Sequence, residues 1–140
     1  MATWQSYNIQ TGAVESPKLW EIGLTSEIWV ATLTTALANG DTILGPPIPA
    51  NTYLEALTID CDDLDGGAAL TFNVGYAGNT AAFIVASTVG QTGGFASLNV
   101  PGTTGLTFSQ TTVVLVTITH AASPAVAGKM RIKVTYTASP

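Results

Sequence analysis

The stretch Leu70–Tyr76, LTFNVGY, decides the fold class because its apolar and polar side chains alternate strictly. Successive side chains of a β-strand point to opposite faces, so this period of two predicts a strand with one buried face. The stretches Tyr53–Cys61, YLEALTIDC, and Lys129–Thr137, KMRIKVTYT, predict strands in the same way. No segment keeps the 3.6-residue period of a helix over three turns. The sequence therefore predicts an all-β protein.

The rest of the chain predicts further short strands, separated by turns rich in glycine, proline and asparagine. These strands are expected at residues 28–37, 42–44, 82–88 (which also fit one helical turn), 95–100 and 112–119. The prolines of Gly45–Pro49 cannot donate to a central ladder, so that segment is expected at a sheet edge or in a rigid loop. The run at 112–119, TVVLVTIT, is apolar on both faces, which predicts a central strand covered on both sides. About eight short strands at this spacing indicate a single β-sandwich or jelly-roll-like domain.

The N-terminal segment differs from the rest. Residues 1–26 are expected to form an extended arm ahead of a β-sandwich domain of residues 27–140, because their aromatic residues are too widely spaced for one regular element. The large rings of Trp4, Tyr7 and Trp20 must be buried somewhere, either on their own domain or on a neighbouring protein. We therefore treat these three residues as candidate partner-binding residues.

Charged side chains are scarce: they make up 9% of the 140 residues, against about 25% in an ordinary globular domain. Mixed surface charge keeps monomers apart, so this scarcity indicates that much of the surface faces a partner, and we expect a homo-oligomer. The formal net charge of −5 argues against a nucleic-acid partner, which requires clustered Lys and Arg. Residues 1–10 lack the features of a signal peptide, and no apolar run approaches the roughly 20 residues that span a bilayer, so no membrane partner is expected.

No group of residues in the sequence matches a catalytic or cofactor site. The acidic segment Asp60–Asp65, followed by Gly66 and Gly67, could offer oxygen ligands to calcium, but its spacing fails the EF-hand pattern, and a solvated hairpin turn is the favoured interpretation. His120 has no carboxylate or nucleophile near it in sequence, and Cys61 falls on the apolar face of its strand. We expect no enzymatic activity, no cofactor and no metal.

Three of the four basic residues alternate along the last predicted strand, which places Lys129, Arg131 and Lys133 on its outward face. This stripe is either a solvated surface or a contact with an acidic neighbouring surface, including the acidic turn of another copy. We treat the three residues as candidate partner-binding residues.

A series of turn and strand motifs, in this order, resembles the capsid decoration (cement) proteins of tailed bacteriophages, which are small β-sandwich head proteins encoded near the major capsid protein. The motifs that carry the resemblance are Asn39–Asp41, Gly45–Pro46, Pro49–Thr52, Asp62–Ala68, Leu70–Tyr76, Gly93–Gly94 and Ala127–Lys129. None of them is a catalytic motif, and the N-terminal arm is not part of the resemblance.

The resemblance implies a structural protein of the virion that is assembled in the host cytoplasm. Such a protein binds the major capsid protein on the outer surface of the head, stabilises the shell, and commonly forms a homotrimer. The alternative function is a receptor- or glycan-binding β-sandwich module of a phage tail fibre or similar assembly. A sugar site in such a module would need exposed aromatic rings, for which Trp4, Trp20, Trp29 or Tyr53 could serve.

Overall fold

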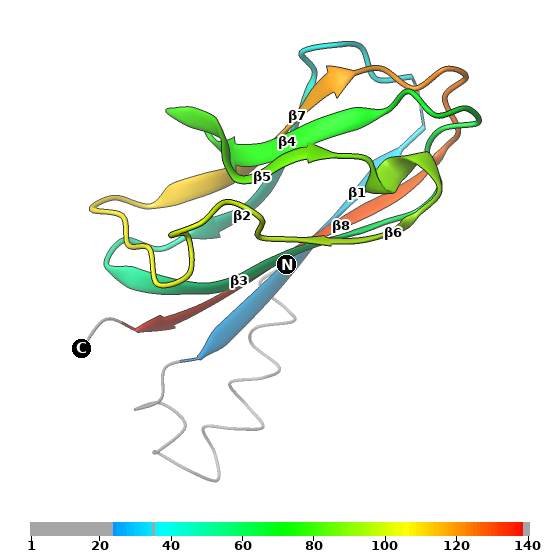
Figure 1. Cartoon of the computed structure of the whole chain (residues 1–140). Helices are drawn as coiled ribbons and strands as arrows, with labels where there is room; N and C mark the ends of the chain where they lie inside the picture. Colours follow the sequence, from blue (N-terminus) through cyan, green and yellow to red (C-terminus); the bar gives the residue numbers. More distant parts are fainter. Residues whose placement is uncertain (1–23, 35, 139–140) are drawn as a thin grey trace, which may run out of the picture.

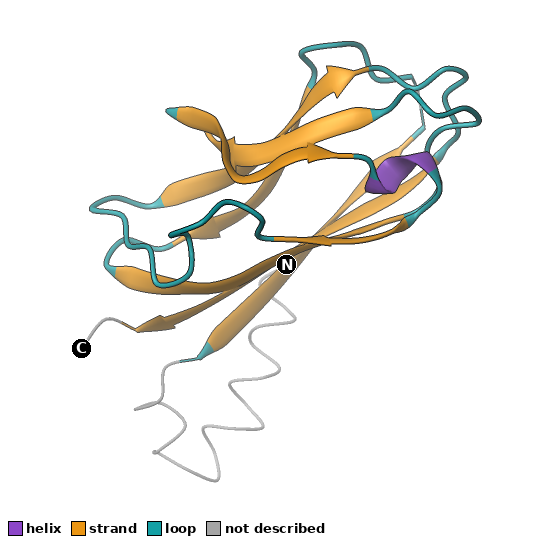
Figure 2. Ribbon diagram, in the orientation of Figure 1, coloured by secondary structure: helices purple, strands orange, loops and turns teal. Residues whose placement is uncertain are grey.

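Two four-stranded antiparallel sheets face each other in a computed structural model that describes residues 24–34 and 36–138 (Figures 1 and 2). One sheet has the strand order β1-β8-β3-β6 and the other β2-β7-β4-β5. The strands are β1 Thr25–Leu33, β2 Thr42–Ile48, β3 Thr52–Cys61, β4 Thr71–Tyr76, β5 Asn79–Ser87, β6 Gly94–Ser97, β7 Thr112–His120 and β8 Gly128–Ala138, with one short 3-10 turn, η1 Val89–Gln91. The prediction of an all-β sandwich of about eight strands is confirmed.

The two sheets differ in charge. Acidic and basic side chains occur in β1, β3 and β8, so we call β1-β8-β3-β6 the charged sheet. The strands β2, β4, β5 and β7 contain no Asp, Glu, Lys or Arg, so we call β2-β7-β4-β5 the neutral sheet. In the described part of the chain, charge is therefore confined to one layer of the sandwich and to the loops.

The core lies between the sheets and follows the predicted alternation. The charged sheet contributes one side-chain row from each long central strand, and the neutral sheet contributes the facing rows, all with almost no exposed surface: Leu57, Ile59, Met130, Ile132, Val134, Phe72, Val74, Val114, Val116 and Ile118. Cys61 lies on the same buried face, as expected from the sequence. Tyr76, Phe83 and Phe108 pack edge to face or tilted, with centroids 5.1 to 6.3 Å apart, and join a loop residue to the core.

Both edges of the neutral sheet are irregular. Pro46 and Pro47 lie within the edge strand β2, where the pairing with β7 shifts register between Leu44 and Pro47. The proline-rich segment is thus an edge strand, the first of its two predicted alternatives. At the opposite edge, the pairing of β5 with β4 shifts register twice, and Ala86 has a φ of 54°. Residues 82–88, which fitted a strand or a helical turn, mostly belong to β5.

Strand β7 corrects one prediction. It is central in its sheet, but only one of its faces is covered, because Val114, Val116 and Ile118 are buried while Val113 is 42% exposed and Leu115 half-buried. The sequence predicted cover on both faces because a strand buried on both sides is usually a continuous apolar run. In this sandwich the second layer covers only the inner face, and the outer apolar face of β7 lies at the surface of the chain.

Candidate interaction surface

The acidic turn is organised around one buried carboxylate. Asp65 is 2% exposed and accepts hydrogen bonds from the N–H groups of Gly67 (2.9 Å), Ala69 (2.7 Å), Leu70 (2.7 Å) and Ser123 (3.0 Å). Burial by itself raises the pKa of this carboxyl, but the four N–H donors outweigh burial and lower the pKa to about 2. Asp65 therefore joins the turn before β4 to the loop before β8, and a cation would have to displace these donors.

The other carboxylates of the segment point elsewhere. Asp63 accepts a hydrogen bond from the Asp65 N–H at 3.1 Å, and Asp62 accepts one from the Lys129 N–H at 2.8 Å. The Lys129 N–H, and after it the Arg131 side chain, lower the pKa of Asp62. In residues 24–34 and 36–138, no three carboxylate, imidazole or thiol side chains gather as metal ligands. The segment works as a hydrogen-bonded turn.

The depressed pKa of Asp65 predicts a stability that depends on acid pH. Its ionised form stabilises the fold fully above its ordinary pKa of 3.8, and this contribution is lost as the pH falls from there towards about 2. We expect the melting temperature of the chain to exceed that of Asp65→Asn by a constant amount above about pH 5, and the gap to shrink as the pH approaches 2. Thermal melts of both proteins from pH 7 to pH 2 measure the gap. A gap that stays constant over this range would contradict the assignment.

The basic stripe lies on the outer face of the charged sheet, as its alternation predicts. Lys129, Arg131 and Lys133 are all the basic residues in the described part of the chain, and they follow one another along β8. Arg131 is partnered within its own chain: both terminal nitrogens of its guanidinium donate to Asp62 Oδ1 at 3.2 Å, and one lies 3.6 Å from Asp60 Oδ2. These ion pairs hold the guanidinium against two carboxylates of its own chain, and a lysine lies on either side of Arg131 along β8.

Two exposed apolar side chains flank this ion pair, one at each edge of the sheet. Val30 on β1 pairs across the ladder with Arg131, Arg131 with Asp60, and Asp60 with Phe95 on β6. Cross-strand partners share a face, so the four residues form one line across the sheet, which we call the outer row. Phe95 is 74% exposed and Val30 is 54% exposed. Phenylalanine and arginine are among the residue types enriched at protein interfaces relative to the rest of the surface.

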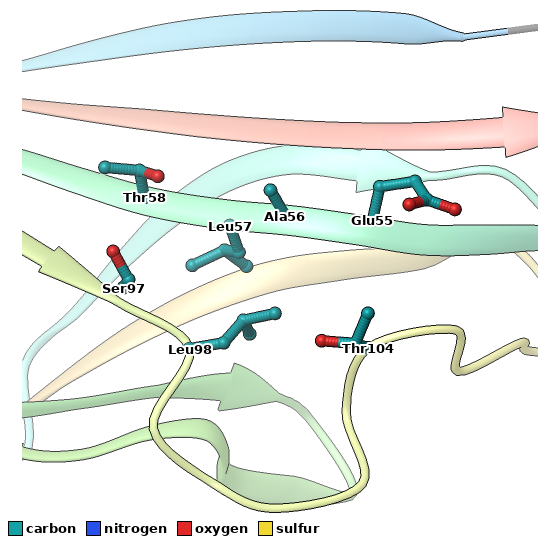
Figure 3. Close-up of a pocket in the computed structure, with 7 residues that line it drawn as sticks. All are labelled: Glu55, Ala56, Leu57, Thr58, Ser97, Leu98 and Thr104. Atoms are coloured by element: carbon teal, nitrogen blue, oxygen red, sulfur yellow. The ribbon is translucent and has the colours of Figure 1, made fainter.

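A shallow, open hollow lies beside the outer row (Figure 3). It arises because β6 pairs with β3 only as far as Ser97, and the chain then loops away before Gly105 N–H donates to Leu54 O at 2.6 Å. The hollow has a volume of about 230 Å³ and is lined by Glu55, Ala56, Leu57, Thr58, Ser97, Leu98 and Thr104. Its mixture of a leucine floor and hydroxyl groups suits a small side chain of a protein partner.

The remaining predicted residues lie apart from this face or outside the described residues. Trp4, Tyr7 and Trp20, together with the 1–26 arm except its last residues, lie outside them. Trp29 is half-buried, and its Nε1 donates to Glu27 Oε1 at 2.8 Å, which leaves this nitrogen already partnered. Burial, and after it the charges of Asp62 and Asp60, raise the pKa of Cys61 to about 12, which keeps the thiol protonated.

His120 is exposed at the end of β7, as expected. In the described ranges, no helix has the length and apolar character to cross a membrane.

Comparisons with known proteins relate the chain to phage capsids. No protein-family model matches the chain, and no curated protein matches it. The chain is similar to a chain of the cyanophage Pam1 capsid asymmetric unit and to a chain of the capsid of Ralstonia phage GP4, each with a TM-score of 0.72 and 27% sequence identity. Each likeness covers 84% of this chain, together with 86% of the Pam1 chain and 85% of the GP4 chain. These likenesses support a phage-capsid-related, structural and non-enzymatic protein.

Proposed function

We propose that the chain is a capsid decoration (cement) protein that binds the major capsid protein on the outer surface of a phage head and stabilises the shell as a homotrimer. The observation that carries this proposal is the likeness to chains of two phage capsids over 84% of its length. Each match spans nearly the same share of both partners, so those capsid chains are close to this one in size. A component of this size is one domain, as expected of a small accessory protein.

The outer row of the charged sheet is the surface that we assign to the head. Among the described aromatic residues Phe95 is the most exposed, Val30 adds apolar area at the other edge, and Arg131 is already held in place by two carboxylates. A fixed arginine between apolar side chains loses little side-chain entropy on binding. Lys129 and Lys133 add positive charge on either side, which favours an acidic partner surface and a faster encounter at low salt.

Binding to undecorated heads tests this assignment. We expect Phe95→Ala to weaken co-sedimentation of the chain with heads at least tenfold, because loss of an interface hot spot costs about 2 kcal/mol or more. Val126→Ala is the matched control, since Val126 is also an exposed apolar residue but lies in the loop before β8. The control should bind like the unchanged chain.

Two outcomes would contradict the proposal. Equal binding of Phe95→Ala and Val126→Ala would remove the outer row from the interface, and failure of the unchanged chain to bind heads would reject the decoration role. A third variant that lacks residues 1–23 tests the arm, which we expect to anchor the chain to the head through Trp4, Tyr7 and Trp20. It should remain folded and lose co-sedimentation. A large fall in melting temperature with binding retained would instead assign these rings to the chain's own domain.

A further inference from the structure

Strand β5 is an edge strand whose own sequence offers no protection against pairing with another chain. It lies at one edge of the neutral sheet, with β4 as its neighbour. Its nine residues, NTAAFIVAS, include neither a charged residue nor a proline. Charges, prolines and short length are the features that keep an edge strand from adding a further strand, and uncharged apolar segments pair most readily. Any protection of β5 must therefore come from residues outside the strand.

Asn99 occupies the open edge of β5. It lies two residues after β6, the edge strand of the charged sheet on the same side of the sandwich (Figure 1). Its N–H donates to Phe83 O at 3.0 Å, and its side chain accepts from the Val85 N–H at 2.9 Å and donates to Val85 O at 3.3 Å. An antiparallel partner would bond every second residue of an edge strand, which is the spacing of Phe83 and Val85. One residue thus forms hydrogen bonds that a neighbouring strand would otherwise form.

Two further asparagines bond backbone groups next to this contact. The Asn79 side chain accepts a hydrogen bond from the Ala81 N–H at 3.3 Å, and the Asn73 side chain on β4 accepts one from the Ala86 N–H at 2.8 Å. Ala86 lies in the bulge, where a φ of 54° and a register shift take the chain out of the regular ladder. Asparagine side chains therefore hold the edge in a form that departs from a regular strand.

The hydrogen bonds of Asn99 to Val85 lie at the surface, so they add little to the stability of the fold. Asn99 is exposed, and Val85 is 45% exposed. Water can replace either partner of an exposed hydrogen bond, which leaves only a small net loss when the bond is removed. The larger effect of these bonds is to occupy backbone groups that another chain could use.

We propose that Asn99 is an edge cap that seals a strand-addition site on β5. The sealed site would take an extended, apolar and uncharged segment, and the β5 strand of a second copy has this chemistry. While Asn99 is bonded to Phe83 and Val85, such a segment would have to displace it before pairing. The inference goes beyond the proposed function, because it concerns the free chain and requires no head.

A peptide-binding experiment on the full chain tests the edge cap. The probe is a fluorescein-labelled peptide with the sequence of residues 79–87, flanked by lysines to keep it soluble, and fluorescence anisotropy measures its binding. We expect Asn99→Ala to bind this peptide at least ten times more tightly than the unchanged chain does, because the variant presents the Val85 N–H and C=O groups without a competitor. Equal affinities of the two proteins would overturn the proposal.

Asn39→Ala is the matched control. Asn39 is also exposed, and its side chain also accepts a hydrogen bond from a distant backbone N–H, that of Ala121 at 2.7 Å, but it lies in the turn before β2. The control should bind the peptide like the unchanged chain, and thermal melts of the two variants should agree within a few degrees. A much lower melting temperature for Asn99→Ala alone would make Asn99 a support of the fold and would overturn the edge cap.

A second substitution locates the peptide. In the Asn99→Ala background, Val85→Lys places a charge on the exposed edge, which disfavours strand addition. We expect this double variant to bind the peptide as weakly as the unchanged chain. Tight binding that persists in the double variant would place the peptide elsewhere and would overturn the proposal. These measurements contain no heads, so their failure and a failure of the decoration role are distinguishable.

Discussion

Asp65→Ala should lower the melting temperature of the chain by about 10 °C or more, although the residue belongs to what looks in sequence like a solvated acidic turn. The substitution removes the acceptor of four backbone N–H groups, among which the Leu70 N–H is buried just before β4. Buried donors without an acceptor keep their full desolvation cost. Thermal melting at pH 7, followed by far-ultraviolet circular dichroism, measures the loss.

Asp63→Ala is the matched control for this prediction. Asp63 lies in the same turn but is exposed, and its side chain accepts a single hydrogen bond, from the Asp65 N–H at 3.1 Å. We expect its melting temperature to fall by no more than a few degrees. Similar losses for both variants would mean that the general negative charge of the turn, rather than the Asp65 hydrogen bonds, supports the fold.

Gly75→Ala should destabilise the chain by about 3 kcal/mol, because β5 folds closely over this position of β4. A Cβ atom at residue 75 would overlap the carbonyl oxygen of Asn79 and would lie 2.6 Å from Thr80 C and 2.8 Å from Ala82 N. All three contacts are backbone atoms, so no flexible side chain can turn aside to make room. Between its pairings with Val74 and Tyr76, β5 uses the extra residues that create this close approach.

Gly78→Ala is a control in the same hairpin, since a Cβ atom there would meet only the Tyr76 ring, at an ordinary 3.4 Å. Denaturant titration of both variants compares their free energies of unfolding. If Gly75→Ala were as stable as Gly78→Ala, the β5 backbone would have to move away from β4 at little cost.

The strand layout could be predicted from the sequence because alternation is a local property. Leu70–Tyr76 and Lys129–Thr137 each specify which side chains face the core without reference to any other strand, and both assignments hold. The outer cover of β7 could not be predicted in this way. The side chains of Val113 and Leu115 show that the strand is apolar on its second face, but not whether another layer covers it.

The candidate interaction surface depends on register, which a single sequence does not specify. Asp62 and Arg131 are 69 residues apart in the chain, and their contact arises from the pairing of β3 with β8. Phe95 was expected only as part of a strand, because an exposed phenylalanine and a core phenylalanine look alike in a short apolar segment. The burial of Asp65 likewise depends on Ser123 in a distant loop, although the glycines after Asp65 indicated a tight turn.

The irregular edges of the neutral sheet limit how copies of this chain can assemble. Prolines interrupt β2 and a bulged path interrupts β5, so neither edge offers a regular ladder on which the next copy could continue the sheet. Endless polymerisation in the manner of a fibril is thereby blocked for this layer. Copies of this chain can meet through the faces of this layer, but they cannot extend its sheet from edge to edge. Copies of this chain can therefore accumulate without this layer joining them into fibres.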